Sequence, residues 1–410
     1  MRRRRKFLGV AFLLAQALVL SAQPQLENKV GFYQWLGVSD HAGDLLTQAR
    51  EHSTALGSRV FRLYLGCRYD YVNPVMAPQR FNHTDALSPT AILSTVDYYR
   101  AVLDDPALET IILTVYSCAN YGGGPDDINL QRPWSEREHS MAADQIGELS
   151  DWLYEHYGDQ HKTVILANNE SDEKLRDIAN YTGSMELAAT NMRSWLTTRQ
   201  QAISAARQRH PDANLKLFHA VEVSLVNLAL RESDGVFNKT SRPGVNALSH
   251  VVPEIKFDLV SYSAYESANS PFETQNPDVP PAETKERLQR DLDRIRERAR
   301  SSVTEAGRAE FGDRFVMIGE LGYSRDRFEH LPSGGLKPRL KSALSAALDW
   351  GCPYIVLWQV FDAPRQGSEA WGFGLYDVAG STPEIAAEPD TCNTLHDCMK
   401  ALYDSGIASW

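Results

Sequence analysis

The sequence predicts an α/β fold, a single (β/α)8 (TIM) barrel. Short apolar runs recur along the 410-residue chain, and amphipathic segments separate them. Continuous apolar runs that alternate with helices are typical of a parallel sheet covered on both faces. There are eight such runs, which is the strand count of this barrel. The alternative is an open doubly wound sheet, but the glycine-rich phosphate turn that such sheets often carry is missing.

The predicted strands are the apolar runs themselves. They span residues 29–37, 58–66, 109–117, 162–168, 215–223, 257–265, 314–322 and 353–361. In a barrel of parallel strands, the C-terminal ends of all strands lie at one face, where the loops form a shared site. Polar residues at those ends are therefore candidates for function.

Between the strands, apolar residues recur at three- and four-residue spacing, which predicts helices that pack one face against the sheet. The predicted helices span residues 45–56, 91–103, 142–157, 185–209, 284–306 and 340–348, with a short helix near 245–251. Gly57 and Gly351 stand where the C-terminal caps of two of these helices are expected.

Residues 1–22 have the layout of a signal peptide, which leaves residues 23–410 as the barrel domain. A basic head precedes an apolar segment from Phe7 to Leu20 that is too short to span a membrane comfortably. The Arg4-Arg5 pair also resembles a twin-arginine export signal, but we favour an ordinary signal whose head is rich in arginine. We expect a secreted or periplasmic protein without membrane contact after cleavage.

The charge balance favours neutral partners. Loss of the five basic residues of the N-terminal head leaves 37 Lys+Arg against 53 Asp+Glu, a net charge of about −16. Such a surface repels nucleic acid and anionic lipid. We therefore expect no nucleic-acid partner, and we expect a monomer.

Five cysteines follow the signal segment, and export would allow them to form disulfides. Cys392 and Cys398 could pair near the C-terminus, Cys67 and Cys118 could pair between neighbouring strands, and Cys352 would remain a free core thiol. Their spacing matches no zinc pattern, and no HExxH is present. We expect neither a metal nor another cofactor.

Polar and aromatic residues gather at the C-terminal ends of the predicted strands. They are Trp35, Arg62, Tyr116, Asn169, Glu170, Glu222, Tyr265, Glu320, Trp358 and Asp362. The stretch VILANNESD brings Glu170 to the end of the fourth strand, and Glu320 ends the seventh. Closure of the barrel would bring these two carboxyl groups across one mouth.

The residues at these ends, taken in order, resemble the clan A glycoside hydrolase superfamily, barrels that include cellulases and mannanases, although no subfamily can be assigned. That clan carries an Asn-Glu pair after strand four and a second Glu after strand seven. The positions that match its motifs are Arg62, Asn169, Glu170, Tyr265, Glu320 and Trp358. The resemblance covers nearly the whole chain after the signal segment.

The resemblance implies a secreted, retaining β-glycoside hydrolase that acts on an oligo- or polysaccharide. Glu170 would serve as acid and then base, and Glu320 as the nucleophile. The two carboxyl groups should then lie about 5–5.5 Å apart, whereas an inverting enzyme would show a wider gap.

The neighbouring residues should separate the proton affinities of the two carboxyl groups. Arg62 would hold Glu320 ionised by charge proximity, and Tyr265 would add a hydrogen bond to it. Glu170, near an anionic partner, should have a raised pKa.

Substrate contacts are expected from a further three side chains. Asn169 could donate to the 2-hydroxyl of the sugar. Trp35 and Trp358 offer flat apolar faces that suit pyranose rings.

Two positions depart from the clan's pattern. Members often carry a proline after the Asn-Glu pair and a histidine two residues before the strand-six tyrosine, where this chain has Ser171 and Ser263. These departures motivate the alternative hypothesis, a secreted carbohydrate-binding or scaffold barrel that has lost turnover.

Several candidates also have purely structural interpretations. Glu222 ends a strand but lacks a flanking motif, so a structural ion pair is favoured over a role in an accessory subsite. Arg62 could serve only an ion pair, because a buried arginine needs a carboxylate. Trp35 and Trp358 could be packing residues, and His219 within its strand is expected to be a core residue.

Overall fold

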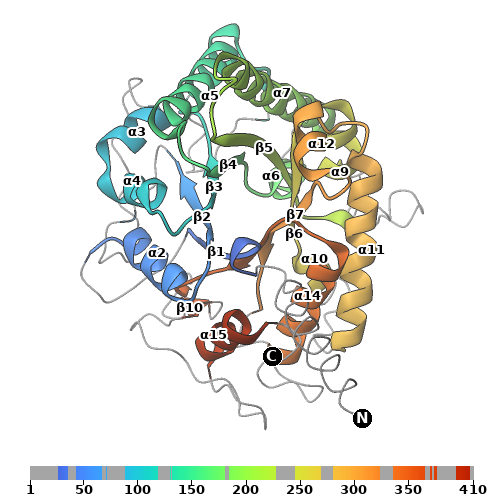
Figure 1. Cartoon of the computed structure of the whole chain (residues 1–410). Helices are drawn as coiled ribbons and strands as arrows, with labels where there is room; N and C mark the ends of the chain where they lie inside the picture. The colour runs from blue at the N-terminus through green and yellow to red at the C-terminus, as the bar shows by residue number, and fades with distance from the viewer. Residues whose placement is uncertain are drawn as a thin grey trace, which may run out of the picture.

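The computed structural model describes residues 26–35, 43–66, 71, 88–118, 130, 132–180, 184–227, 245–268, 280–323, 336–364, 370–371, 374–375 and 394–406. Eight parallel strands form a closed barrel in chain order, and β8 pairs with β1 to complete the circle (Figure 1). Helices form a ring outside the strands. The predicted barrel is confirmed, and the closing β1–β8 pair excludes the open sheet.

Each predicted apolar run contains one barrel strand. The strands are β1 (Val30–Gln34), β2 (Val60–Leu65), β3 (Thr110–Val115), β4 (Thr163–Ala167), β5 (Lys216–Val223), β6 (Leu259–Ser263), β7 (Val316–Leu321) and β8 (Ile355–Trp358). Almost every strand residue is buried, because helices cover the outside and side chains fill the inside. A two-stranded pair, β9 (Ala363–Pro364) and β10 (Ala370–Trp371), follows β8.

The described helices follow the predicted ones with a few differences. They are α2 (Leu45–Ala55), α3 (Pro89–Thr95), α4 (Asp97–Asp104), α5 (Glu136–Tyr157), α6 (Ser171–Asn180), α7 (Met185–Arg209), α9 (Ala247–His250), α10 (Tyr265–Ala268), α11 (Pro281–Ala299), α12 (Glu305–Phe311), α14 (Leu336–Trp350) and α15 (Leu395–Ser405). Two short 3-10 turns, Leu26–Asn28 and Val252–Glu254, complete them.

Two predicted helices are interrupted. The segment predicted over 91–103 divides into α3 and α4, because Val96 takes an extended conformation with φ −110° and ψ 107°. The segment predicted over 284–306 ends at Ala299, and a new helix, α12, begins after Thr304, whose side chain accepts from Gly307 N. Periodicity alone did not reveal either break, since apolar spacing continues across both.

Gly57 and Gly351 take the positions expected of them. Gly57 has φ 99° and Gly351 has φ 91°, and each follows the end of a helix. Glycine reaches this left-handed region without the steric cost that a Cβ atom imposes.

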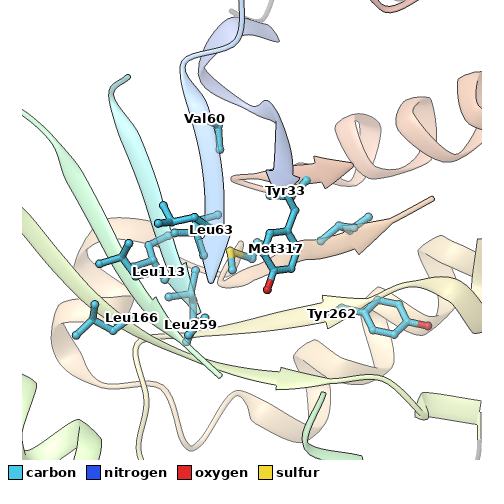
Figure 2. Close-up of a cluster of buried hydrophobic side chains, with 14 of the residues drawn as sticks. Tyr33, Val60, Leu63, Leu113, Leu166, Leu259, Tyr262 and Met317 are labelled. Atoms are coloured by element: carbon cyan, nitrogen blue, oxygen red, sulfur yellow. The ribbon is translucent and has the colours of Figure 1, made fainter. Parts of the chain in front are cut away.

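The core of the molecule lies inside the strands and between strands and helices. Figure 2 shows part of it, with apolar side chains contributed by β1, β2, β3, β4, β6 and β7. Leu63, Leu113, Leu166, Leu259 and Met317 are each at most 1% exposed. This packing fixes the strands, and thereby the functional side chains at their C-terminal ends.

The cysteines are described only in part. Cys352 is a buried free thiol, as expected, and Cys118 and Cys398 are disulfide-bonded. Their expected partners, Cys67 and Cys392, lie outside the described residues, so both pairings stay predictions.

The signal-peptide prediction for residues 1–22 also lies outside the described residues. None of the helices that the structure describes is both long enough and apolar enough to cross a bilayer.

Candidate active site

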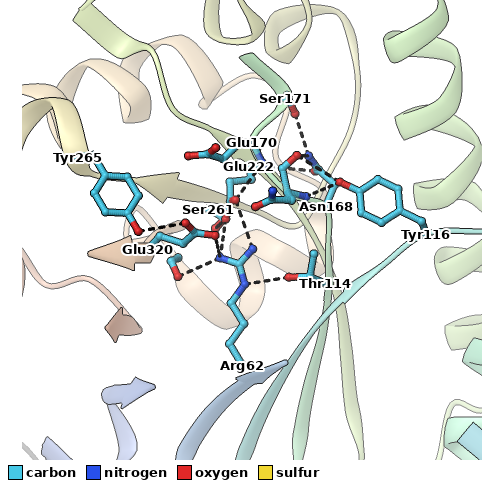
Figure 3. Close-up of polar contacts among 12 residues, drawn as sticks. Arg62, Thr114, Tyr116, Asn168, Glu170, Ser171, Glu222, Ser261, Tyr265 and Glu320 are labelled. Carbon is cyan, nitrogen blue, oxygen red and sulfur yellow. Dashed lines mark hydrogen bonds and ion pairs between the residues drawn. The ribbon is translucent and has the colours of Figure 1, made fainter. Parts of the chain in front are cut away.

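The candidate residues from six strands meet at the C-terminal end of the barrel. Figure 3 shows the carboxyl groups of Glu170, Glu222 and Glu320 gathered between Tyr265 on one side and Tyr116 on the other, with Arg62 reaching them from β2. Glu170 lies three residues beyond the end of β4 and immediately before α6, whereas Glu222 lies on β5 and Glu320 on β7. The closed barrel thus unites residues that are far apart in sequence.

Arg62 makes its principal ion pair with Glu222, not with Glu320. Its Nη1 lies 2.7 Å from Glu222 Oε2, and its Nη2 lies 3.3 Å from Glu222 Oε1. The same Nη1 is 3.6 Å from Glu320 Oε1. The structural ion pair favoured for Glu222 is therefore present, and it crosses the barrel interior from β2 to β5.

The remaining donors of Arg62 are also used. Nη1 donates to the carbonyl oxygen of Gly319 at 2.9 Å, and Nε donates to Thr114 Oγ1 at 2.9 Å. The guanidinium carbon stacks 4.3 Å from the centre of the Tyr33 ring. Arg62 is completely buried, so these contacts fix its orientation.

Glu320 is the more buried of the two proposed catalytic carboxyl groups, at 4% exposed, while Glu170 is half-buried. The hydroxyl of Tyr265 donates to Glu320 Oε2 at 3.3 Å, which is the expected hydrogen bond. Burial and the negative charge of Glu222 raise the pKa of Glu320 well above its ordinary value, and the charge of Arg62 opposes them. The expectation that Arg62 keeps Glu320 ionised is wrong. Arg62 pairs mainly with Glu222, and its charge does not offset the effects of burial and of Glu222 on the pKa of Glu320.

Tyr265 faces both carboxyl groups. Burial raises the pKa of its hydroxyl well above the ordinary value, and the charges of Glu320 and Glu170 raise it further. Tyr265 therefore remains protonated and acts as a hydrogen-bond donor.

The main chain around Glu170 is held by several hydrogen bonds. Its N–H donates to Glu222 Oε1 at 3.0 Å, and the preceding Asn169 N–H donates to the Tyr116 hydroxyl at 2.8 Å. Glu170 has φ 27°, a left-handed conformation that costs a non-glycine residue about 1–2 kcal/mol. These contacts hold a backbone conformation that the residue would not adopt unaided.

Asn168 and Asn169 reinforce this arrangement. Asn168 accepts from Glu222 N at 3.1 Å and donates to Ser171 Oγ at 2.9 Å. With its amide nitrogen facing the carboxylates, Asn169 donates to Glu320 Oε1 at 3.1 Å and to Glu222 Oε1 at 3.3 Å. Ser171, where the clan often has proline, here supplies the hydroxyl that Asn168 bonds at the start of α6.

Ser263, the second departure from the clan pattern, lies beside Glu320 in the sheet. It is 1% exposed, and its hydroxyl has no hydrogen-bond partner among the described residues. A serine leaves more space at this position than a histidine would.

The aromatic candidates form one packed group at the end of β1 and β8. Trp35 stacks on Tyr64 with ring centres 5.0 Å apart, and it meets Trp358 edge to face at 5.9 Å. Tyr33 lies 5.0 Å from Trp358 in a second edge-to-face contact. Trp358 is 7% exposed and Trp35 is half-buried, so packing accounts for most of their surface.

Two of the strand-end residues serve as supports. Tyr116 binds the Asn169 peptide, as described above, and Asp362 accepts from Gly374 N at 2.6 Å.

His219 is buried and hydrogen-bonded by Arg199 and Gln200. Burial and the charge of Arg199 lower its pKa well below the ordinary value. It is a core residue, as predicted.

Three residues outside the predicted set complete the network. Thr114 lies within β3 and accepts from Arg62 Nε. Ser261 lies within β6 and donates to Glu222 Oε2 at 2.5 Å. A Cβ atom at Gly319 would stand 2.6 Å from Glu222 Oε2 and 2.8 Å from Arg62 Nη1. A glycine one residue before a candidate catalytic glutamate is a signal that could have been used.

Comparison with known proteins supports the fold. No protein-family profile and no curated protein matches the sequence. Among solved structures, the chain is similar to the exo-β-1,4-mannosidase Op5Man5 from Opitutaceae bacterium strain TAV5, with a TM-score of 0.51, 15% identity and 93% of this chain covered. The chain spans 60% of the length of that mannosidase.

A second similar structure is the β-glucosidase from Thermotoga maritima in complex with cyclophellitol. It aligns with a TM-score of 0.51 and 14% identity, over 93% of this chain and 98% of the glucosidase. At these identities the similarity concerns the fold. The chain shares its barrel with these glycoside hydrolases.

Proposed function

We propose that this protein is a retaining β-glycoside hydrolase, with Glu170 as the acid/base and Glu320 as the nucleophile. The observation that carries the proposal is that two carboxyl groups, one after β4 and one on β7, lie together beside Tyr265, whose hydroxyl donates to Glu320. Two catalytic carboxyl groups in a common cleft are what glycosidic cleavage requires. The barrel shared with an exo-β-1,4-mannosidase and a β-glucosidase supports the same chemistry.

The reaction proceeds by two displacements at the anomeric carbon. In the first, the carboxylate of Glu320 forms a bond to this carbon while the glycosidic C–O bond breaks, and Glu170 gives its proton to the leaving oxygen. In the second, Glu170 takes a proton from a water molecule, the water oxygen attacks the anomeric carbon, and the ester to Glu320 breaks. Both carboxyl groups return to their starting states.

The surrounding residues serve this sequence of steps. Tyr265 donates to Glu320 Oε2, and Asn169, beside Glu320 Oε1, would donate to the 2-hydroxyl of the sugar. The half-buried face of Trp35 and the edge of Trp358 would contact the pyranose ring. The substrate is a carbohydrate, an oligo- or polysaccharide.

Single substitutions test the two roles. Glu170→Gln and Glu320→Gln should each abolish most hydrolysis of a panel of aryl β-glycosides and polysaccharides, while Glu155→Gln, on the exposed outer face of α5, should leave it unchanged. A mechanism-based 2-fluoroglycoside should label a peptide that contains Glu320. Hydrolysis that survives both substitutions would refute the assignment.

Added azide separates the acid/base from the nucleophile. In Glu170→Ala the azide ion should attack the glycosyl-enzyme and give a product of retained configuration. In Glu320→Ala no glycosyl-enzyme forms, so azide should attack the substrate directly and give the inverted product. The opposite pattern would exchange the two roles.

A non-catalytic carbohydrate-binding barrel is the second candidate, and the Ser171 and Ser263 departures favour it. Oligosaccharide binding measured by calorimetry without any turnover would support it over the hydrolase.

We also propose that residues 1–22 direct the protein out of the cytoplasm and are removed, leaving a monomer of residues 23–410. N-terminal sequencing of the exported protein and its mass in solution test these two points.

A further inference from the structure

Glu222 occupies the centre of the polar network but cannot contact a substrate. Its exposed fraction is 0%, and β5 carries it beneath the mouth of the barrel. Both of its carboxylate oxygens accept hydrogen bonds from groups on other strands. A fully buried carboxylate that accepts from one guanidinium, one main-chain N–H and one hydroxyl is fixed in position.

One oxygen of Glu222 holds the main chain of the proposed acid/base. Glu222 Oε1 accepts from Glu170 N at 3.0 Å, and it is also the oxygen that Asn169 reaches at 3.3 Å. The left-handed conformation of Glu170 makes this hydrogen bond more consequential than an ordinary main-chain contact. Without it, the acid/base side chain would lose a restraint on its direction.

The other oxygen of Glu222 binds the guanidinium that would otherwise serve the nucleophile. Glu222 Oε2 lies 2.7 Å from Arg62 Nη1, whereas Glu320 Oε1 lies 3.6 Å from the same atom. Ser261 Oγ donates to the same Oε2 at 2.5 Å. Two carboxyl groups, those of Glu222 and Glu320, thus lie beside a single guanidinium, and Glu222 has the shorter contact with it.

We propose that Glu222 is a positioning residue of the reaction, which holds the Glu170 peptide in place and takes the principal ion pair of Arg62 away from Glu320. The proposal rests on the glycosidase function proposed above. Glu222 lies outside the motifs on which the family resemblance depends, yet it would affect both proposed catalytic carboxyl groups.

Loss of the Glu222 charge should favour the ionised form of Glu320. The charged and titratable groups that face it are Arg62 from β2, Glu170 after β4, Glu222 from β5, Tyr265 from α10 and Tyr33 from β1. Removing the negative charge of Glu222 removes a repulsion from Glu320 and frees Arg62 to pair with it. Both changes favour the carboxylate form of Glu320, so they cannot cancel.

The variant that tests the proposal is Glu222→Gln. Its acidic limb in the pH dependence of kcat/KM should move to lower pH by about one unit. The value of kcat at the optimum should fall by about 100-fold. The glutamine amide would present an N–H donor to the cationic Arg62, and Glu170 would be misplaced. A purely structural role would lower the amount of folded protein without moving the limb.

Glu222→Asp is the matched variant, since it retains the charge and withdraws the carboxylate from Glu170 N. It should lower kcat while its acidic limb stays at the wild-type pH. If Glu222→Gln does not fold, an Asp variant with wild-type kcat would overturn the positioning role. In a folded Glu222→Gln variant, an unmoved limb would overturn the charge role.

A readout without turnover separates this proposal from the proposed function. The side-chain carboxyl ¹³C resonance of Glu320, assigned by its loss in Glu320→Gln, should titrate at lower pH in Glu222→Gln than in the wild type. A wild-type protein that hydrolyses no glycoside would refute the function, whereas an unchanged titration would refute the role of Glu222.

Discussion

Arg62 and Glu222 form a completely buried ion pair across the barrel, from β2 to β5, with Nη1 2.7 Å from Oε2 and no exposed surface on either side chain. Thr114 and the Gly319 carbonyl take further donors of Arg62, and Ser261 binds the same oxygen of Glu222. A buried pair with its hydrogen bonds satisfied tolerates the loss of both partners better than the loss of one. The pair therefore matters to the stability of the barrel as well as to the site.

Arg62→Met is expected to lower the free energy of unfolding by about 3–5 kcal/mol, because it leaves Glu222 buried without its cation. The double variant Arg62→Met/Glu222→Gln should recover part of that loss. Urea unfolding followed by circular dichroism measures both.

Arg300→Ala provides the control for this prediction. Its ion pair with Asp313 is about two-thirds exposed on both sides, and such pairs contribute about 0–1 kcal/mol. If Arg62→Met were no more destabilising than Arg300→Ala, the stabilising role of the buried pair would be wrong.

Gly319→Ala is expected to disrupt the network by overpacking. The new Cβ would meet Glu222 Oε2 at 2.6 Å and Arg62 Nη1 at 2.8 Å, and it would come even closer to Ser261 Oγ. Such overpacking costs about 1–3 kcal/mol. The proposed glycosidase activity should fall as well, because the proposed nucleophile Glu320 is the next residue.

Two variants control for the substitution itself. Gly147→Ala adds the same methyl group within α5, where no atom beyond its chain neighbours and the backbone of the helix itself lies within 4 Å, and it should be neutral or slightly stabilising. Ser261→Ala combined with Gly319→Ala removes the nearest atom and should restore part of the stability. Equal thermal unfolding of Gly319→Ala and Gly147→Ala would contradict the steric argument.

The barrel could be predicted from the sequence because its signal is repeated and strong. Strands such as β4 and β3 are buried on both faces, so they read as unbroken apolar runs. The helices α6 and α15 were not predicted. α6 (Ser171–Asn180) carries only three apolar residues, Leu175, Ile178 and Ala179, too few for apolar spacing to indicate a helix.

The candidate site was predictable only at the strand ends. Glu170, Tyr265 and Glu320 could be located because a barrel brings these ends together. The choice of Arg62 between Glu222 and Glu320 depends on contacts between strands that are not neighbours, and no local sequence pattern encodes it. For the same reason the roles of Ser261 and Gly319 emerged only from the structure.

Glu266 is expected to make the stability of the barrel depend on pH. It is 8% exposed in α10, and burial together with the charges of Asp172 and Asp291 raises its pKa to about 7. Since the folded-state pKa is above the unfolded one, the folded protein binds the proton more tightly. Stability contributed by the protonated form is therefore present at pH 4 and is lost as the pH rises to about 7.

Glu266→Gln should remove this dependence, because its amide keeps an oxygen to accept from Asn227 N and carries no charge. Relative to the wild type, the variant should gain about 3 kcal/mol in unfolding free energy between pH 4.5 and pH 8, an order-of-magnitude figure. Urea midpoints at both pH values measure it. The exposed Glu155→Gln serves as control, and a gain of the same size there would contradict the assignment to Glu266.

The hydrogen bond from Tyr265 to Glu320 predicts a shift of the pH–activity profile. Burial and the charge of Glu222 raise the pKa of Glu320, so the acidic limb of kcat/KM should lie above the range of an ordinary carboxyl group. As the proposed nucleophile, Glu320 would be protonated below that limb and could not attack. The Tyr265 hydroxyl acts in the opposite direction, because it stabilises the ionised carboxylate.

Tyr265→Phe should therefore move the acidic limb to higher pH, opposite to the movement expected of Glu222→Gln. Tyr157→Phe, which removes a hydroxyl bonded to Asp104 on the outside of the barrel, should leave the limb in place. Profiles of kcat/KM on one aryl β-glycoside decide the matter. Movement of both active-site variants in the same direction would show that packing, and not charge, governs the proton affinity of Glu320.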